Sequence, residues 1–131
     1  MTDAPAPSSA VDRQAIHRTD GALRVTWIGH ASFLASLSGA SFLIDPVFSS
    51  RIGYVIPRHG RAGVQPEDLP AIDALVVTHN HYDHLDAPSL RTLRRDLPVV
   101  APAGLGSWFR RRRMDCAWWW WRARGPWGAC G

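Results

Sequence analysis

Three short segments in the first half of the chain carry the apolar patterns of β-strands. Residues 23–28 place Leu, Val and Trp at every second position, and residues 33–37 and 41–44 are apolar segments on either side of a Ser-Gly turn. A period of two puts alternate side chains on opposite faces of a sheet. Together with the turn, the three segments predict an antiparallel meander.

A second group of segments predicts a strand, a helix and another strand in succession. Residues 72–77 and residues 97–101 form apolar runs. Between them, residues 86–95 have leucines at helical spacing, with Asp86 as the expected N-cap and Pro88 in the first turn. This order predicts a right-handed β-α-β crossover with parallel strands.

The remaining segments divide the chain around these elements. Residues 1–20 are rich in Ala, Pro and Ser and predict a mobile leader, whereas the glycines and prolines of residues 49–71 predict a long loop. We expect a short helix over residues 106–114 and a domain over residues 21–114. Residues 115–131, with four consecutive tryptophans, have neither strand nor helix period and predict an irregular tail rich in Trp and Arg.

Length and charge limit the classes of protein to which this chain can belong. The 131 residues fit one domain at most, and no apolar run reaches the ~20 residues of a membrane-spanning helix. The first residues lack the basic and then apolar pattern of a signal peptide, which predicts a cytoplasmic protein. Nine arginines and ten acidic residues precede Trp108, and six arginines and one aspartate follow from there. The net charge of +4 therefore belongs to the end of the chain, and no specific nucleic-acid partner is expected.

Candidate metal ligands are concentrated in residues 78–86, Thr-His-Asn-His-Tyr-Asp-His-Leu-Asp, directly after a strand-like run. Zinc prefers imidazole and carboxylate ligands, and alternate side chains of extended backbone project to the same side. The economical interpretation is two metals. His79 and His81 would hold one. Asp83 and His84 would hold the other. A loose histidine tract of low affinity is the alternative, but a position at the end of a strand favours a built site.

The order His-x-His-x-Asp-His after a strand resembles the metal signature of the metallo-β-lactamase superfamily. Four segments resemble the branch that contains N-acyl-phosphatidylethanolamine phospholipase D and the ascorbate-6-phosphate lactonase-like hydrolases. These segments are residues 25–33, 43–48, 66–73 and 78–86. The resemblance extends over residues 23–113.

This resemblance implies a fold of the α+β or α/β class, namely the N-terminal half of an αββα sandwich. It implies that His79 and His81 bind the first metal. It also implies that Asp83 and His84 bind the second, with Asp83 as the catalytic residue that orients metal-bound water. The implied cofactor is Zn²⁺, up to two ions per intact site, with Mn²⁺ or Fe²⁺ as alternatives. The implied reaction is hydrolysis of a small-molecule or lipid phosphodiester, or of a lactone ester, by metal-bound hydroxide.

The later ligands of the family have no counterpart in this chain. They are a histidine, a bridging aspartate and a final histidine, and no histidine follows His84. Because catalytic zinc usually has three protein ligands, we expect a truncated domain with impaired hydrolysis. The codon repeated in residues 118–121 encodes glycine or valine in the other reading frames, which leads to the hypothesis that the residues after Met114 are out of frame.

Two further residues have alternative interpretations. His30, at a strand turn, could lie near the metals or the substrate, or could bond only to backbone. Asp45 ends a strand before Pro46, and it could orient a metal-bound histidine or serve only as a turn-former.

A function of a different class is also open. The chain could be a non-catalytic fragment, or a basic, Trp-rich binder of a membrane or nucleic-acid surface through residues 108–131. Half a sandwich would also leave one face of its sheet uncovered, which predicts self-association.

Overall fold

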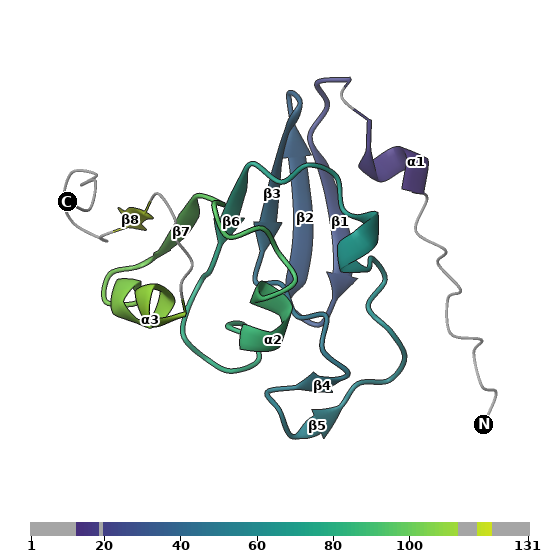
Figure 1. Ribbon diagram of the computed structural model, residues 1–131. Helices are drawn as coiled ribbons and strands as arrows, with labels where there is room; N and C mark the ends of the chain where they lie inside the picture. The colour runs from purple at the N-terminus through teal and green to yellow at the C-terminus, as the bar shows by residue number, and fades with distance from the viewer. Residues whose placement is uncertain (1–12, 19, 113–117, 122–131) are drawn as a thin grey trace, which may run out of the picture.

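The computed structural model describes residues 13–18, 20–112 and 118–121, and the expectations for the other residues of the leader and tail lie outside this part of the chain. A mixed sheet of six strands forms its centre, in the order β1-β2-β3-β6-β7-β8 (Figure 1). These strands are β1 (Arg24–Gly29), β2 (Ser32–Leu37), β3 (Ala40–Ile44), β6 (Ala74–Val76), β7 (Val99–Pro102) and β8 (Trp118–Trp121).

The pairing of the strands follows the predicted order. β1, β2 and β3 pair antiparallel, so the predicted meander is confirmed. β6 and β7 are parallel neighbours on either side of a helix, as the second group of segments predicted. β8 pairs parallel to β7 within the tail for which we expected no regular structure. The backbone N–H and C=O groups along the edge of β7 can pair with an extended segment of any sequence, so this pairing does not require a strand-like side-chain pattern.

Two predictions about the segments between strands were wrong. The helix expected over residues 86–95 is only α2 (Ala87–Leu90), because Thr92 donates both its N–H and its hydroxyl to the carbonyl of Ser89 and turns the chain. Its cap is confirmed, since Asp86 accepts from the N–H of Ser89. The loop expected over residues 49–71 contains regular structure. Its elements are the hairpin of β4 (Arg51–Ile52) and β5 (Ile56–Pro57) and the 3-10 helix η1 (Pro66–Asp68).

The remaining helices pack on the same core. α3 (Gly106–Arg111) lies within the short helix expected over residues 106–114, and its Phe109 is fully buried. α1 (Arg13–Ile16) lies inside the segment expected to be a leader, and its Ile16 is buried. None of the helices in the described ranges has the length and apolar character that a membrane crossing requires.

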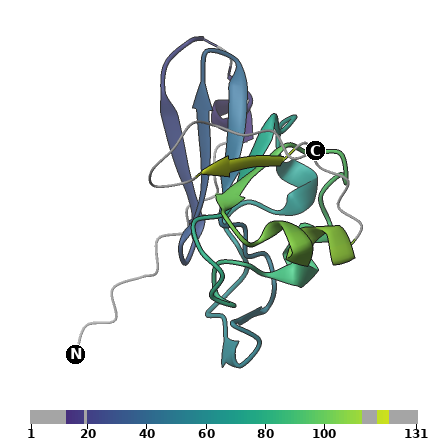
Figure 2. The same ribbon diagram turned by 90° about the vertical axis from the view of Figure 1, so that its left-hand side faces the viewer.

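The two faces of the sheet differ in their cover. One face holds the fully buried leucine and valine side chains of the core, and α2, α3 and η1 lie on the same side of the sheet (Figure 2). The other face is also apolar but open: Val25 and Trp27 are 61% and 63% exposed. Cross-strand register continues this apolar face through Phe33, Ile44 and Val76. Within residues 13–18, 20–112 and 118–121, no helix covers it.

Candidate metal centre

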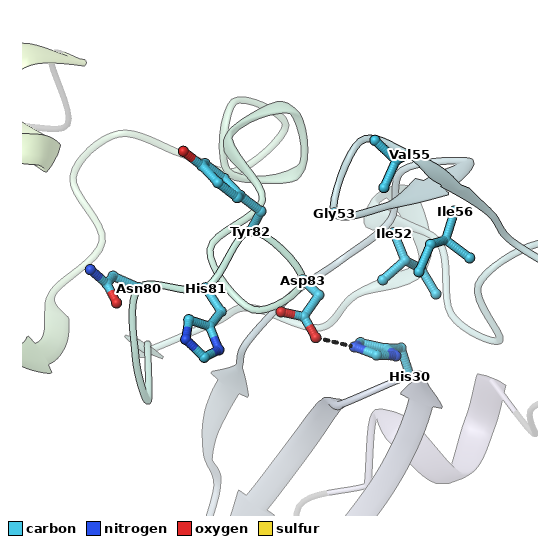
Figure 3. A pocket seen from close by; sticks show the side chains of 9 residues that line it. All are labelled: His30, Ile52, Gly53, Val55, Ile56, Asn80, His81, Tyr82 and Asp83. Carbon is cyan, nitrogen blue, oxygen red and sulfur yellow. Dashed lines mark hydrogen bonds and ion pairs between the residues drawn. The ribbon is translucent and has the colours of Figure 1, made fainter.

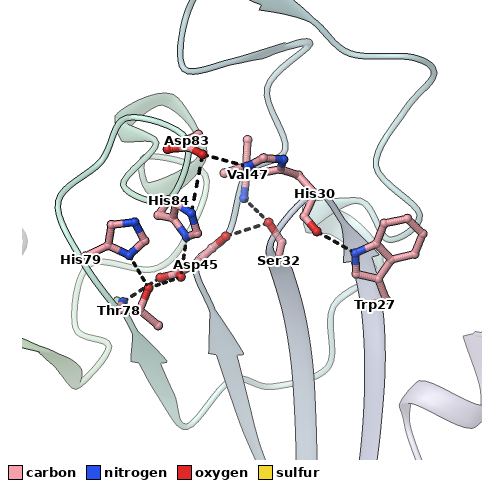
Figure 4. A network of polar contacts seen from close by, with 9 residues as sticks. All are labelled: Trp27, His30, Ser32, Asp45, Val47, Thr78, His79, Asp83 and His84. Atoms are coloured by element: carbon pink, nitrogen blue, oxygen red, sulfur yellow. Dashed lines mark hydrogen bonds and ion pairs between the residues drawn. The ribbon is translucent and has the colours of Figure 1, made fainter.

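The sheet topology brings three distant segments to one edge. β3 and β6 are parallel, with Ile44 paired to Val76, so their carboxyl ends lie side by side. Asp45 follows β3, the histidine motif follows β6, and the turn between β1 and β2 carries His30 to the same place (Figure 4). Open α/β sheets carry their sites at this edge.

Asp45 is the buried anchor of the cluster. Its side chain is 3% exposed and its backbone has φ +43°, a left-handed conformation that non-glycine residues seldom adopt. One carboxylate oxygen accepts from the N–H of Thr78 at 2.8 Å. The other accepts from the Thr78 hydroxyl at 2.5 Å and contacts Nδ1 of His84 at 2.8 Å. Since an ionised carboxylate only accepts, Nδ1 of His84 is the donor in this contact, and Nε2 is the nitrogen left to face a ligand.

Thr78 extends the same arrangement to His79. Its hydroxyl donates to Asp45 and can therefore accept from Nδ1 of His79, which lies 2.8 Å away. Nε2 of His79 is then also left free, and the rings of His79 and His84 lie 3.9 Å apart between centroids. Sequence reasoning missed this role of Thr78, although its place directly before the first motif histidine was the available signal.

A second layer fixes the backbone around Asp45. The buried Ser32 donates its hydroxyl to the carbonyl of Asp45 at 2.7 Å and accepts from the N–H of Val47 at 2.9 Å. Arg58 donates to the carbonyl of Val47 at 2.6 Å, and burial lowers the pKa of its guanidinium. Arg58 also packs against Gly29, where an added Cβ would clash with its Nη2. Each of these contacts restrains the turn that carries Asp45.

His30 and Asp83 face each other in front of this buried layer. Nε2 of His30 lies 3.1 Å from Oδ2 of Asp83, which in turn lies 3.6 Å from Nε2 of His84. Burial raises the pKa of Asp83, but the hydrogen bond to His30, a backbone hydrogen bond and the charges of His84 and His30 outweigh it. The net pKa is lowered, so the carboxylate stays ionised.

The clustering differs from the pairing that the sequence suggested. Among the residues that the structure describes, two groups of three candidate ligands have their ligand atoms within 4.8 Å of one another, and His84 belongs to both. These groups are His30 with Asp83 and His84, and Asp45 with His79 and His84. His81 belongs to neither group; its exposed ring lies 4.6 Å from that of His79. Because both oxygens of Asp45 are already hydrogen-bonded, the first group is the more open to an ion.

A pocket of about 550 Å³ opens beside the cluster (Figure 3). Its polar side includes His30, His81 and Asp83, and its other side belongs to the β4–β5 hairpin. This hairpin was not predicted, because the glycines and prolines of residues 49–71 are typical of a loop. The apolar residues on either side of Gly53 were the signal that could have predicted it.

Comparison with known proteins places these observations in a family. A family profile described as a β-lactamase superfamily domain matches residues 41–116. N-acyl-phosphatidylethanolamine-hydrolyzing phospholipase D 1 of Caenorhabditis elegans is 33% identical over 84% of this chain and 33% of its own length. A UPF0173 metal-dependent hydrolase of Myxococcus xanthus is 39% identical over 62% of this chain and 26% of its own length.

A solved structure agrees with these relatives. CmlA, a diiron β-hydroxylase from Streptomyces venezuelae, superposes with a TM-score of 0.59 and 32% identity, over 81% of this chain and 22% of its own. The chain belongs to the β-lactamase superfamily, and its mixed sheet with few helices agrees with that fold. It spans a third or less of the length of these relatives.

Proposed function

We propose that this chain carries the metal-binding part of a metal-dependent hydrolase. The observation that carries the proposal is the convergence of His30, Asp83 and His84, with Nδ1 of His84 held by the buried Asp45. A carboxylate behind a ligating histidine fixes its tautomer and orients its free nitrogen. The printed name of the Myxococcus relative, a metal-dependent hydrolase, supports the same class.

The residues present fit a divalent ion. Imidazole nitrogens and a carboxylate are ligands for zinc, and also for iron and manganese. The four motif residues His79, His81, Asp83 and His84 are the ligands we propose, with His30 as a further ligand and Asp45 behind them. Zinc is the metal we propose, with iron as the alternative because CmlA is a diiron protein. A bound ion supplies a Lewis acid and lowers the pKa of a coordinated water.

The side chains themselves would bind, orient and accept protons. The side chain of Asp83 is 38% exposed and lines the pocket, where its carboxylate can accept a hydrogen bond from an attacking water. The substrate class we propose is a phosphodiester, a phospholipid or a lactone ester. The name of the worm relative, which hydrolyses an N-acyl phospholipid, supports the second of these. Because no histidine follows His84, we expect the 131 residues by themselves to hold metal weakly and to turn over slowly.

Metal analysis combined with hydrolysis assays tests the proposal. The purified chain should take up zinc in competition with a chromogenic chelator, and His84→Ala should abolish most uptake because His84 belongs to both ligand groups. His59→Ala is the matched control, since His59 is exposed and belongs to neither group. Equal uptake by both variants contradicts the proposed centre.

A second proposal concerns partners rather than chemistry. The open apolar face of the sheet, with Val25, Trp27 and Leu37 exposed, supports self-association through that face. Contact with an anionic membrane surface is a further proposal, supported by the exposed arginines 110–112 at the end of α3.

A further inference from the structure

The β4–β5 hairpin presents apolar side chains to solvent beside the candidate metal centre. Val55 is 72% exposed and Ile56 is 61% exposed, and the neighbouring Tyr82 is 70% exposed. An exposed turn usually carries polar side chains, which interact well with water. Apolar side chains that gather on a surface mark a site where another apolar group is bound.

The pocket between the hairpin and the motif is divided by polarity. Ile52, Val55 and Ile56 line it from the hairpin, whereas His30 and Asp83 lie at its polar end (Figure 3). Its volume of about 550 Å³ falls in the ~300–1,000 Å³ range of small-molecule sites. No arginine is among its nine lining residues. Arg51, the cation of the hairpin itself, donates instead to the carbonyl of Val55 at 3.4 Å.

The hairpin is held close to the centre. Gly53 has φ +58°, and a Cβ built on it would lie 4.0 Å from Cβ of Asp83. Tyr54 has φ +70°, a strained conformation for a large side chain. Its ring meets the ring of Tyr82 edge-on, with centroids 5.7 Å apart, which helps to offset that strain. The apolar side chains therefore form a fixed wall of the pocket.

We infer that this wall binds a linear acyl or alkyl chain of the substrate, with the hydrolysable head at the His30 and Asp83 end. The inference rests on the proposed hydrolase function, and among its proposed substrates it favours those with an acyl or alkyl chain. An amphiphile matches a pocket with one polar end and one apolar side. A small, wholly polar phosphorylated lactone would leave Val55 and Ile56 without a partner and would find no polar partner on them.

Calorimetric titration with methyl-, butyl- and octylphosphonate tests the inference on the full chain. These ligands are not hydrolysed, and each is used below its micelle-forming concentration, with Zn²⁺ and after EDTA treatment. Burial of each added methylene should tighten binding by about two- to fourfold. The dependence on chain length should appear with and without metal, whereas Zn²⁺ should strengthen the binding of all three ligands through their shared head.

Substitutions on the hairpin test whether the alkyl chain of the ligand binds there. Val55→Ser and Ile56→Ser should flatten the dependence on chain length and leave the thermal melt unchanged, because both side chains are exposed. Val25→Ser is the matched control, a valine of similar exposure on the open face of the sheet. If Val25→Ser instead removes the dependence, the alkyl chain lies on the sheet and the inference is wrong.

The remaining outcomes separate the inference from the function on which it rests. If all three ligands bind with equal affinity and Zn²⁺ still strengthens their binding, the alkyl site is contradicted and the metal centre is supported. A clear dependence on chain length with no effect of Zn²⁺ supports the alkyl site and contradicts the metal centre.

Discussion

Asp45 and His84 form a 2.8 Å hydrogen bond between a buried carboxylate and an imidazole Nδ1. The two residues are 39 positions apart in the chain. They meet because β3 and β6 are parallel neighbours and both end at the same edge of the sheet. This contact determines which nitrogen of His84 can face a ligand, so it gives the most direct test of the candidate centre.

Asp45→Asn should weaken zinc binding by about 10- to 100-fold, the usual effect of removing a partner behind a metal-bound histidine. The amide of asparagine has one accepting oxygen where the carboxylate has two, and its NH2 group donates, so the ring of His84 loses its fixed tautomer. Chelator competition measures the affinity, and Glu67→Gln, an exposed carboxylate on η1, is the control. Unchanged zinc affinity in a folded Asp45→Asn variant would show that Asp45 serves only the turn.

Thr78→Val should affect His79 more than His84. The substitution keeps the shape of the side chain but removes the hydroxyl that lies between Asp45 and Nδ1 of His79. We expect zinc affinity to fall by up to about tenfold, at the lower end of the range for such partners. Nitrogen NMR of the imidazole rings should report a mixed tautomer for His79 and an unchanged one for His84. Identical spectra of the variant and the parent protein contradict the role of Thr78.

The pKa of Asp83 should lie below its ordinary value of 3.8, because burial raises it less than the hydrogen bond to His30, a backbone hydrogen bond and the nearby histidines lower it. A lowered pKa in the folded state means that the stability from the contacts of the ionised Asp83 carboxylate is present above its ordinary pKa. It is lost as the pH falls through the lowered pKa. His30→Ala should raise the pKa of Asp83 in a carboxyl NMR titration. The pKa of Asp20, lowered mainly by the N–H of Ala22, should not change.

Gly29→Ala should destabilise the fold by about 1–3 kcal/mol, because φ at this position is +129° and an alanine would be strained there. The added methyl would also push Arg58 away from the carbonyl of Val47. Gly39→Ala is the control, since Gly39 has φ +83° and open space around it. Denaturant unfolding should give a larger loss for Gly29→Ala; equal losses would mean that the contact with Arg58 has no part in the effect.

Val25→Lys should reduce self-association of the chain, because a charge on the open apolar face opposes its burial against a second copy. Sedimentation velocity over a range of concentrations measures the change. Val55→Lys, which places the same charge on the hairpin, should leave the association unchanged. A chain that is already monomeric at high concentration contradicts the proposal.

Local signals in the sequence were sufficient to predict the antiparallel meander, the parallel pair of strands and the N-cap of α2. Alternation along β1 and the turn after β2 depend on neighbouring residues alone, and Asp86 reaches the N–H of Ser89 within one turn. The length of α2 was wrong because the competing hydrogen bonds of Thr92 to Ser89 are not visible in leucine spacing. The strand character of Trp118–Trp121 was missed because its pairing depends on the edge of β7 rather than on its own period.

The sequence by itself determined the donor set: histidines and an aspartate at the end of a strand, and hence a candidate metal centre. Only the tertiary structure decided which donors lie together. It placed His30 against Asp83, set Asp45 behind His84, and left His81 outside both groups. The physical reason is that ligand geometry depends on the register of parallel strands and on left-handed turns at His30 and Asp45. These features join residues that are far apart in the chain, and spacing along the chain cannot encode them.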